Sequence, residues 1–254
     1  MTDHASKLKG LMWVIGACLL GACFALGLSP LAHAIPWSWE KKLGHALDAA
    51  NPDRECHGSP QAARLLDRLV DRMYPIQEED KAFSIEVRIA KDPAVNAYAT
   101  LGGQIFINAG LLEQAQSPEE VAGVLAHEIG HVHHRHIMQG ALAHLFTAEG
   151  INIIFGSPSS LAQGAHYFMT MDFSRAQEAE ADEDGLQRLQ IAHVDNNGFK
   201  HFFERMEREG SSPAFLSDHP SGRSRIERVE RFSNASPSPL MTQEEWLILQ
   251  VYCR

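Results

Sequence analysis

The 254-residue chain is predicted to fold as an α+β domain that is mainly helical and carries a small β-hairpin beside a central helix. Apolar residues recur at helical spacing in most segments beyond residue 60, which predicts amphipathic helices. Two short extended runs, 95–101 and 104–108, flank a Gly-Gly pair, which predicts the hairpin. We expect a single domain, because the sequence contains no visible internal repeat or second domain.

The N-terminus has the pattern of an export signal. Two lysines precede an apolar run at 11–28, and Ala32-His33-Ala34 has the small-residue spacing of a signal-peptidase site. We therefore expect residues 1–34 to be a signal peptide. Residues 35–254 would form the functional domain, exported to the bacterial periplasm or cell envelope.

Two other fates of this N-terminus stay open. The segment Leu20-Gly21-Ala22-Cys23 resembles a lipobox, which would make Cys23 a lipidated N-terminus. The apolar run is 18 residues long, which just suffices to span a bilayer as an uncleaved anchor. Either alternative would give membrane association through the N-terminus.

Cysteine usage agrees with export. Removing residues 1–34 leaves two cysteines, Cys56 and Cys253, near opposite ends of the domain. In an oxidising compartment these two can pair. We therefore expect a disulfide between Cys56 and Cys253.

The predicted hairpin turns at Gly102-Gly103. If its outer strand is a sheet edge beside a cleft, its unpaired backbone groups could hold an extended peptide by strand addition. Such binding would need little side-chain selectivity. The alternative is a hairpin that only covers the core.

The central helix begins at a clear N-terminal signal. Ser117 is the expected N-cap, Pro118 occupies the first helical position, and Glu120 is the capping-box partner. Gly140 is the expected terminator. The apolar face of this helix contains Val121, Val124, Leu125 and Ile129.

This helix carries an HExxH motif at 127–131. His127 and His131 stand four residues apart, so both imidazoles can reach one metal ion, and Glu128 can serve as a base. A metzincin would need glycine three residues and histidine six residues after the second motif histidine, but those positions hold His134 and Ile137. A third ligand must therefore come from another segment. We expect His133 and His136 at the surface and assign no role to them or to His134.

A second helical stretch at 172–190 offers carboxylates. Glu178 and Asp182 fall on one of its faces, while Glu180 points elsewhere. Glu178 is the candidate third ligand of a site with two histidines, one glutamate and a water. Asp182 can accept a hydrogen bond from a ligand histidine. The alternative is a solvated acidic helix.

The remaining segments are expected to form scaffold. Residues 141–170 contain an apolar stretch that is too short and too polar to cross a membrane. We interpret them as a core helix followed by a mobile lid, with a membrane-facing element as the alternative. Further helices are predicted at 60–73, 198–209, 223–232 and 241–252, with Leu65, Leu69, Phe202, Phe203 and Met206 in the core.

Four elements in order resemble the HtpX and CAAX prenyl protease family of zinc metallopeptidases. They are HEIGH, the SRxxExEAD pattern at 174–182, the stretch 95–112, and His219-Pro220 with Arg225-Ile226. The resemblance covers about residues 60–235. It implies a zincin-like metallopeptidase fold with the hairpin packed beside the active-site helix.

The resemblance also implies the roles of the site residues. One zinc ion per chain would be bound by His127, His131 and Glu178, with Glu128 as general base for a zinc-activated water. Arg225 or His219 would stabilise the oxyanion. In relatives the histidine at the position of His219 can also approach the metal. His219 is therefore alternatively an inhibitory ligand.

The expected function is hydrolysis of peptide bonds in unfolded or flexible envelope proteins, in protein quality control. The alternatives are a non-catalytic zinc-binding chaperone or adaptor of the same fold, and a histidine-rich metal carrier. Acidic side chains outnumber basic ones by 32 to 22, so we expect no nucleic-acid partner.

Overall fold

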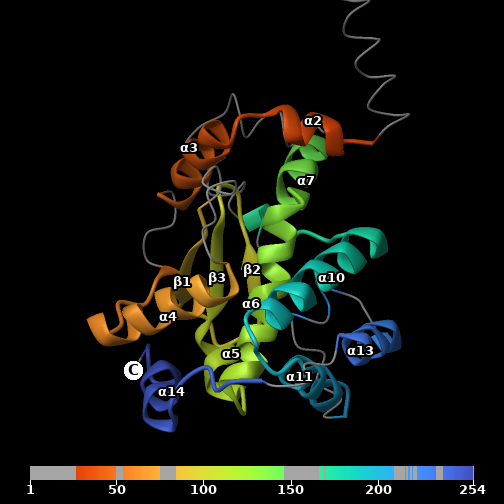
Figure 1. The fold of residues 1–254 in the computed structure, drawn as a ribbon. Coiled ribbons are helices and arrows are strands. Elements are labelled where there is room, and N and C mark those ends of the chain that lie inside the picture. The colour runs from red at the N-terminus through yellow and green to blue at the C-terminus, as the bar shows by residue number, and fades with distance from the viewer. Residues whose placement is uncertain are drawn as a thin grey trace, which may run out of the picture.

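A computed structural model describes residues 27–49, 54–74, 84–145, 166–168, 170–208, 215, 217, 219, 222–232 and 237–253. These residues form a mainly helical structure with one small sheet, which confirms the predicted fold class (Figure 1). Most of the predicted signal segment, including the lipobox, lies outside the described residues, as do residues 146–165 of the stretch 141–170 that was predicted to form a core helix and a lid. Within the described part, no helix is both long and apolar enough to cross a membrane.

The sheet has three strands in the order β1-β3-β2. β2 (Ala97–Ala99) and β3 (Gln104–Asn108) pair antiparallel, which confirms the hairpin. Gly102 and Gly103 have φ values of 80° and 78°, which glycine adopts without strain. β1 (Glu86–Ala90) was not predicted, and it pairs parallel to β3 on the other side. β2 therefore forms the edge of the sheet that lies beside α6 (Figure 1).

The central helix is shorter than the sequence predicted. α6 spans Pro118–His133 and α7 spans His136–Leu145, so Gly140 lies inside a helix and the expectation that it terminates one is wrong. The break falls at Arg135, which has a φ of 56°. Its guanidinium donates to the backbone oxygen of Ile35 at 2.8 Å and to Glu40 at 2.5 Å. Contacts with the N-terminal segment thus hold the left-handed residue that separates the two helices.

Five other helices, α4, α10, α11, α13 and α14, lie close to their predicted positions, whereas α2, α3 and α5 were not predicted. α10 begins with a complete capping box between Ser174 and Gln177. The predicted core side chains of α4 and α11 are buried. The bounds of the remaining described helices are α2 Ser29–Ala34, α3 Trp37–Asp48, α4 Pro60–Met73, α5 Ala109–Gln114, α10 Arg175–Ile191, α11 Asn197–Arg208, α13 Gly222–Arg231 and α14 Gln243–Gln250.

The N-terminal helix α2 contains the expected signal-peptidase site. Ala32 is fully buried, and α2 packs against α7 at the end of the molecule where α3 also lies (Figure 1). Cleavage after Ala34 would remove this helix from the domain.

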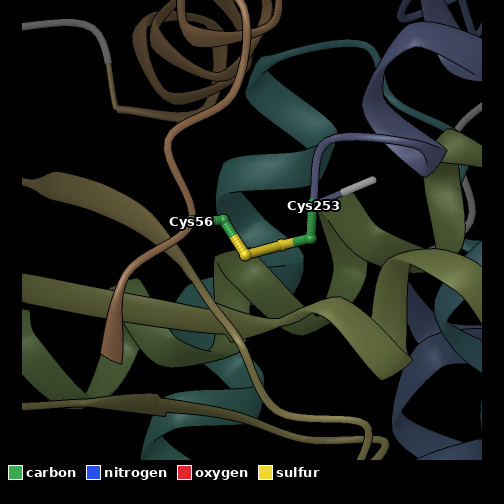
Figure 2. Close-up of a disulfide and its surroundings, with 2 residues drawn as sticks. All are labelled: Cys56 and Cys253. Carbon is green, nitrogen blue, oxygen red and sulfur yellow. A yellow bond between two sulfur atoms is a disulfide. The ribbon is translucent and has the colours of Figure 1, made fainter. Parts of the chain in front are cut away.

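A disulfide joins the segment ahead of α4 to the C-terminal end of the described fold. Cys56 precedes α4 and Cys253 follows α14, and Figure 2 shows their sulfur atoms bonded. Their Cα atoms lie 5.3 Å apart across a sequence separation of 197 residues. The bond ties the C-terminal helix to the segment that leads into α4.

Candidate metal centre

Two helices cross closely at the centre of the molecule, where α10 packs along α6. A Cβ on Gly130 of α6 would lie 2.7 Å from the backbone oxygen of Ala181. A Cβ on Gly185 of α10 would lie 2.9 Å from the backbone carbon of Ala126. Because backbone cannot move aside cheaply, any side chain at either glycine would push the helices apart. The two glycines therefore let carboxylates of α10 reach histidines of α6.

Side-chain atoms from both helices meet at one point. Nε2 of His127 and Nε2 of His131 lie 3.1 Å apart. Oxygens of Glu178 approach these two nitrogens to 3.6 Å and 3.3 Å. Together with Nδ1 of His219, these ligand atoms all lie within 4.8 Å of one another, and all four residues are buried.

His219 reaches this point from the segment ahead of α13. Its Nδ1 lies 2.9 Å from Oε1 of Glu178 and 3.3 Å from Nε2 of His127. Its Nε2 lies 3.4 Å from Oε1 of Glu128. Burial alone would lower the pKa of His219, but the neighbouring carboxylates of Glu128 and Glu178 raise it. This histidine therefore stands between the candidate ligands and the candidate base.

The protonation states suit a divalent cation. Burial lowers the pKa of both His127 and His131, which favours the neutral imidazole at pH 7. Burial alone would raise the pKa of Glu178, but the surrounding histidines lower it, so this carboxylate is ionised. Metal binding requires neutral imidazoles and ionised carboxylates.

This donor set fits zinc. When a proton occupies Nδ1 of His127 and of His131, both Nε2 lone pairs point into the same space at 3.1 Å separation. A cation between the lone pairs and the carboxylate of Glu178 removes their mutual repulsion. Two histidines and one glutamate are the protein ligands of one type of hydrolytic zinc site, and here Nδ1 of His219 lies close to them as a fourth candidate ligand atom.

Asp182 and two arginines surround the ligands. Asp182 lies 2.9 Å from Nδ1 of His127. Arg225 is fully buried and donates to Glu178 at 2.7 Å and to Asp182 at 2.9 Å, while Arg228 donates to Asp182 at 2.6 Å. Two guanidinium groups thus balance two buried carboxylates and hold them in place.

Glu128 lies between the ligands and the edge of the sheet. Its Oε2 accepts a hydrogen bond of 2.9 Å from the backbone N–H of Ala99 in β2. Burial raises the pKa of Glu128 to about 7, although His219 beside it lowers the value. A buried carboxyl group with such a pKa can take and return a proton near neutral pH.

The sequence model of "Peptidase family M48" matches residues 60–233, which include every residue of this centre. The chain belongs to this family.

Several metallopeptidases of known name share this region. The chain is 32% identical over 182 residues to "Mitochondrial metalloendopeptidase OMA1" of Schizosaccharomyces pombe, a match that covers 66% of this chain and 53% of that protein. It is 31% identical over 154 residues to "Metalloprotease LoiP" of Escherichia coli, covering 57% and 60%. It is 25% identical over 178 residues to "Beta-barrel assembly-enhancing protease" of the same bacterium, covering 61% and 36%. The chain thus spans about half the length of the first relative.

One histidine beside the metal centre lies in a different place from the one that the sequence predicted. His136 was expected at the surface but is 1% exposed, and its Nδ1 lies 3.0 Å from Nδ1 of His131. Glu180 of α10 is 58% exposed and points away from the metal ligands, as expected, and its Oε2 lies 3.1 Å from Nε2 of His136. The expectation for His136 assumed one continuous helix, and the break at Arg135 changes the phase of the residues that follow it in α7. No signal in the sequence marked that break.

The other predicted residues are distributed as follows. The structure brings together six residues that were expected in or beside the site, which are named at the end of this paragraph. Arg225 contacts two of them, Glu178 and Asp182. His134 is absent from the described ligand group that contains the motif histidines, although it joins two other groups nearby. Two nitrogens of Arg225 are occupied by carboxylates, so its contacts favour a positioning role over oxyanion binding. The six residues are His127, Glu128, His131, Glu178, Asp182 and His219.

Proposed function

We propose that this chain is a zinc-dependent endopeptidase in which His127, His131 and Glu178 hold one zinc ion and Glu128 is the general base. The observation that carries the proposal is the convergence of three ligand atoms beside a buried carboxylate whose pKa is about 7. Zinc held by such a set polarises a peptide carbonyl and makes water more acidic.

The residues of the chain supply the proton transfers. Glu128 takes a proton from the attacking water and returns it to the amine that leaves, because burial brings its pKa close to neutral pH. The N–H of Ala99 fixes one oxygen of Glu128 and leaves the other for this exchange. His219 lies within reach of the base and donates toward a developing oxyanion, or occupies the fourth ligand position when no substrate is bound. Arg225 holds Glu178 in its ionised form.

The edge strand β2 suits an extended substrate. Asn96 and Thr100 form backbone hydrogen bonds with β3, so the alternating pattern directs the backbone groups of Ala97 and Ala99 toward the outer edge. The N–H of Ala99 already donates to the base, which places this edge directly beside the reacting atoms. A peptide added there would bind through its main chain. The substrates are therefore unfolded or flexible protein segments, with little side-chain selectivity.

The Glu128→Gln variant tests the catalytic proposal. Glutamine keeps the size of the side chain but cannot accept a proton, so hydrolysis of an unfolded casein should fall by about 100-fold or more. The variant should still bind one zinc ion per chain, measured by metal analysis after dialysis. Glu183→Gln is the matched control, because Glu183 is exposed on α10 and should keep full activity.

Two outcomes would contradict this proposal. Undiminished casein hydrolysis by Glu128→Gln would exclude the assigned base. A wild-type protein that binds zinc and prevents aggregation without cutting any substrate would favour the chaperone or adaptor alternative, and binding of several ions per chain would favour a metal carrier.

We further propose that the chain acts in the bacterial cell envelope, in protein quality control. The export-type N-terminus, the Cys56–Cys253 disulfide and the similarity to the bacterial β-barrel assembly-enhancing protease support this location. Mass spectrometry of the purified protein distinguishes the three N-termini. A chain beginning at Ile35 indicates cleavage, a lipid mass on Cys23 indicates a lipoprotein, and an intact N-terminus indicates an anchor.

A further inference from the structure

We propose that Glu180 and His136 are positioning residues for His131, acting together as a relay that fixes the imidazole tautomer needed for metal binding. The relay deepens the proposed function and rests on it, because it presumes that His131 binds the metal through Nε2. None of the predicted roles requires either residue.

The contacts form a continuous chain from the metal centre to solvent. Nδ1 of His131 lies 3.0 Å from Nδ1 of His136, on the side of the ring opposite to the ligand atoms. Nε2 of His136 lies 3.1 Å from Oε2 of Glu180. His136 is 1% exposed, whereas the side chain of Glu180 is 58% exposed. One buried imidazole thus connects a ligand histidine to a carboxylate at the surface.

The position of one proton determines how this series of contacts acts on His131. Two neutral imidazole nitrogens at hydrogen-bond distance share a single proton, which belongs to one ring or to the other. The carboxylate of Glu180 accepts only, so it draws the proton of His136 to Nε2 and leaves Nδ1 as an acceptor. His131 must then carry its proton on Nδ1, and its Nε2 lone pair faces Glu178 and His127.

The two motif histidines are therefore oriented by the same helix in two different ways. Asp182 contacts Nδ1 of His127 directly, whereas Glu180 acts on His131 through His136. The three carboxylates of the run 178–182 then have separate roles, since one binds the metal and the other two each fix one histidine. A hydrogen-bonded partner of this kind raises the basicity of a metal-binding imidazole and holds its ring in place.

The helix break is what brings His136 to this position. On a continuous helix His136 would lie 140° around the axis from His131 after five residues, at about 100° per residue. The left-handed conformation of Arg135 starts α7 in a new direction and returns the side chain of His136 to the metal centre.

A pair of substitutions at His136 tests the relay. Phenylalanine fills a similar volume but offers no acceptor, so His136→Phe should weaken zinc binding by about 10- to 100-fold. Asparagine offers an oxygen close to the position of Nδ1, so His136→Asn should recover most of the affinity. Zinc affinity is measured by competition with a chromogenic chelator, without any activity assay. Cobalt substitution gives a second readout, since the visible absorption of Co²⁺ changes when a ligand rotates or leaves.

Two further variants separate the relay from general effects. Glu180→Ala should weaken zinc binding only a few-fold, because water can replace an exposed acceptor. His133→Ala is the matched control, since His133 belongs to the same histidine-rich run and its Nδ1 lies 3.2 Å from Asp184 of α10. It should bind zinc as the wild type does. Thermal unfolding of the metal-free variants shows whether each one folds.

The outcomes separate the relay from the proposed function. If the wild type binds zinc tightly and folded His136→Phe binds it equally well, the relay is wrong while the metal centre stands. The relay is also wrong if His136→Asn is as impaired as His136→Phe. If the wild type binds no zinc, both the proposed function and the relay are overturned.

Discussion

At the scale of single residues, charge balance dominates this site. Burial of a carboxylate is costly unless it is paired, and Glu178 and Asp182 are both buried. Arg225 is buried with them and contacts both. The folded chain therefore stabilises the ionised carboxylate of Glu178, which metal binding requires.

Replacing Arg225 by alanine should therefore destabilise the metal-free protein strongly. Removing one partner of a buried ion pair leaves an uncompensated charge, and such changes cost about 3–5 kcal/mol. Urea unfolding of the metal-free variant measures the loss. Arg231→Ala on the same helix is the control, because Arg231 is exposed. Equal stability of the two variants would show that Arg225 does not balance the site.

The residue scale also shows where prediction from sequence reached its limit. His127 and His131 could be proposed from motif spacing, which refers to local geometry, whereas Glu178 needed both its helical phase and the resemblance to a known family. The position of His136 could not be predicted, because its contact with His131 depends on the left-handed backbone conformation of the preceding residue, Arg135. Hydrogen bonds from the Arg135 side chain to Glu40 and to the backbone oxygen of Ile35 stabilise that conformation, and both partners lie about a hundred residues away in the sequence.

At the scale of elements, the site depends on the close crossing of α6 and α10. The ligands come from both helices, so their distance is set by the separation of two backbones. Glycine at the crossing points allows that separation, since an added Cβ would overlap the facing backbone.

A methyl group at Gly185 should disturb both stability and metal binding. Gly185→Ala places its Cβ 2.9 Å from backbone atoms of α6, so α10 must shift, at a cost of about 1–3 kcal/mol. Because Glu178 and Asp182 move with α10, zinc affinity should fall as well. Thermal unfolding and chelator competition measure the two effects.

Gln187→Ala is the matched control on α10, since Gln187 is exposed and alanine favours helix. It should leave both quantities unchanged. Unaltered zinc affinity in Gly185→Ala would mean that the ligands do not depend on the helix crossing.

At the scale of the whole molecule, the disulfide closes almost the entire described domain into one loop. Cys56 and Cys253 are separated by 197 residues, and Figure 2 shows the bond between their sulfur atoms. A cross-link over so long a loop restricts the unfolded chain more than it changes the folded one.

Replacing both cysteines by serine should lower the free energy of unfolding by about 3–5 kcal/mol. Denaturant unfolding with and without a reducing agent measures this difference. Reductant should destabilise the wild type by a similar amount and leave the Cys56→Ser, Cys253→Ser double variant unchanged. If reductant has no effect on the wild type, the two cysteines are not paired.

The sequence alone determined the mainly helical fold class, the hairpin, and the capped helix with the two histidines of its HExxH motif, because each depends on local spacing or turn chemistry. The choice of Glu178 as third ligand also rested on the resemblance to a known family. The sequence also allowed the pairing of Cys56 with Cys253 to be expected from a count of cysteines. Tertiary structure alone decided where α6 ends, which residues lie behind the ligands, and how the charges of Glu178 and Asp182 are balanced. These features join segments far apart in the chain, and no local pattern encodes the direction in which one helix leaves another.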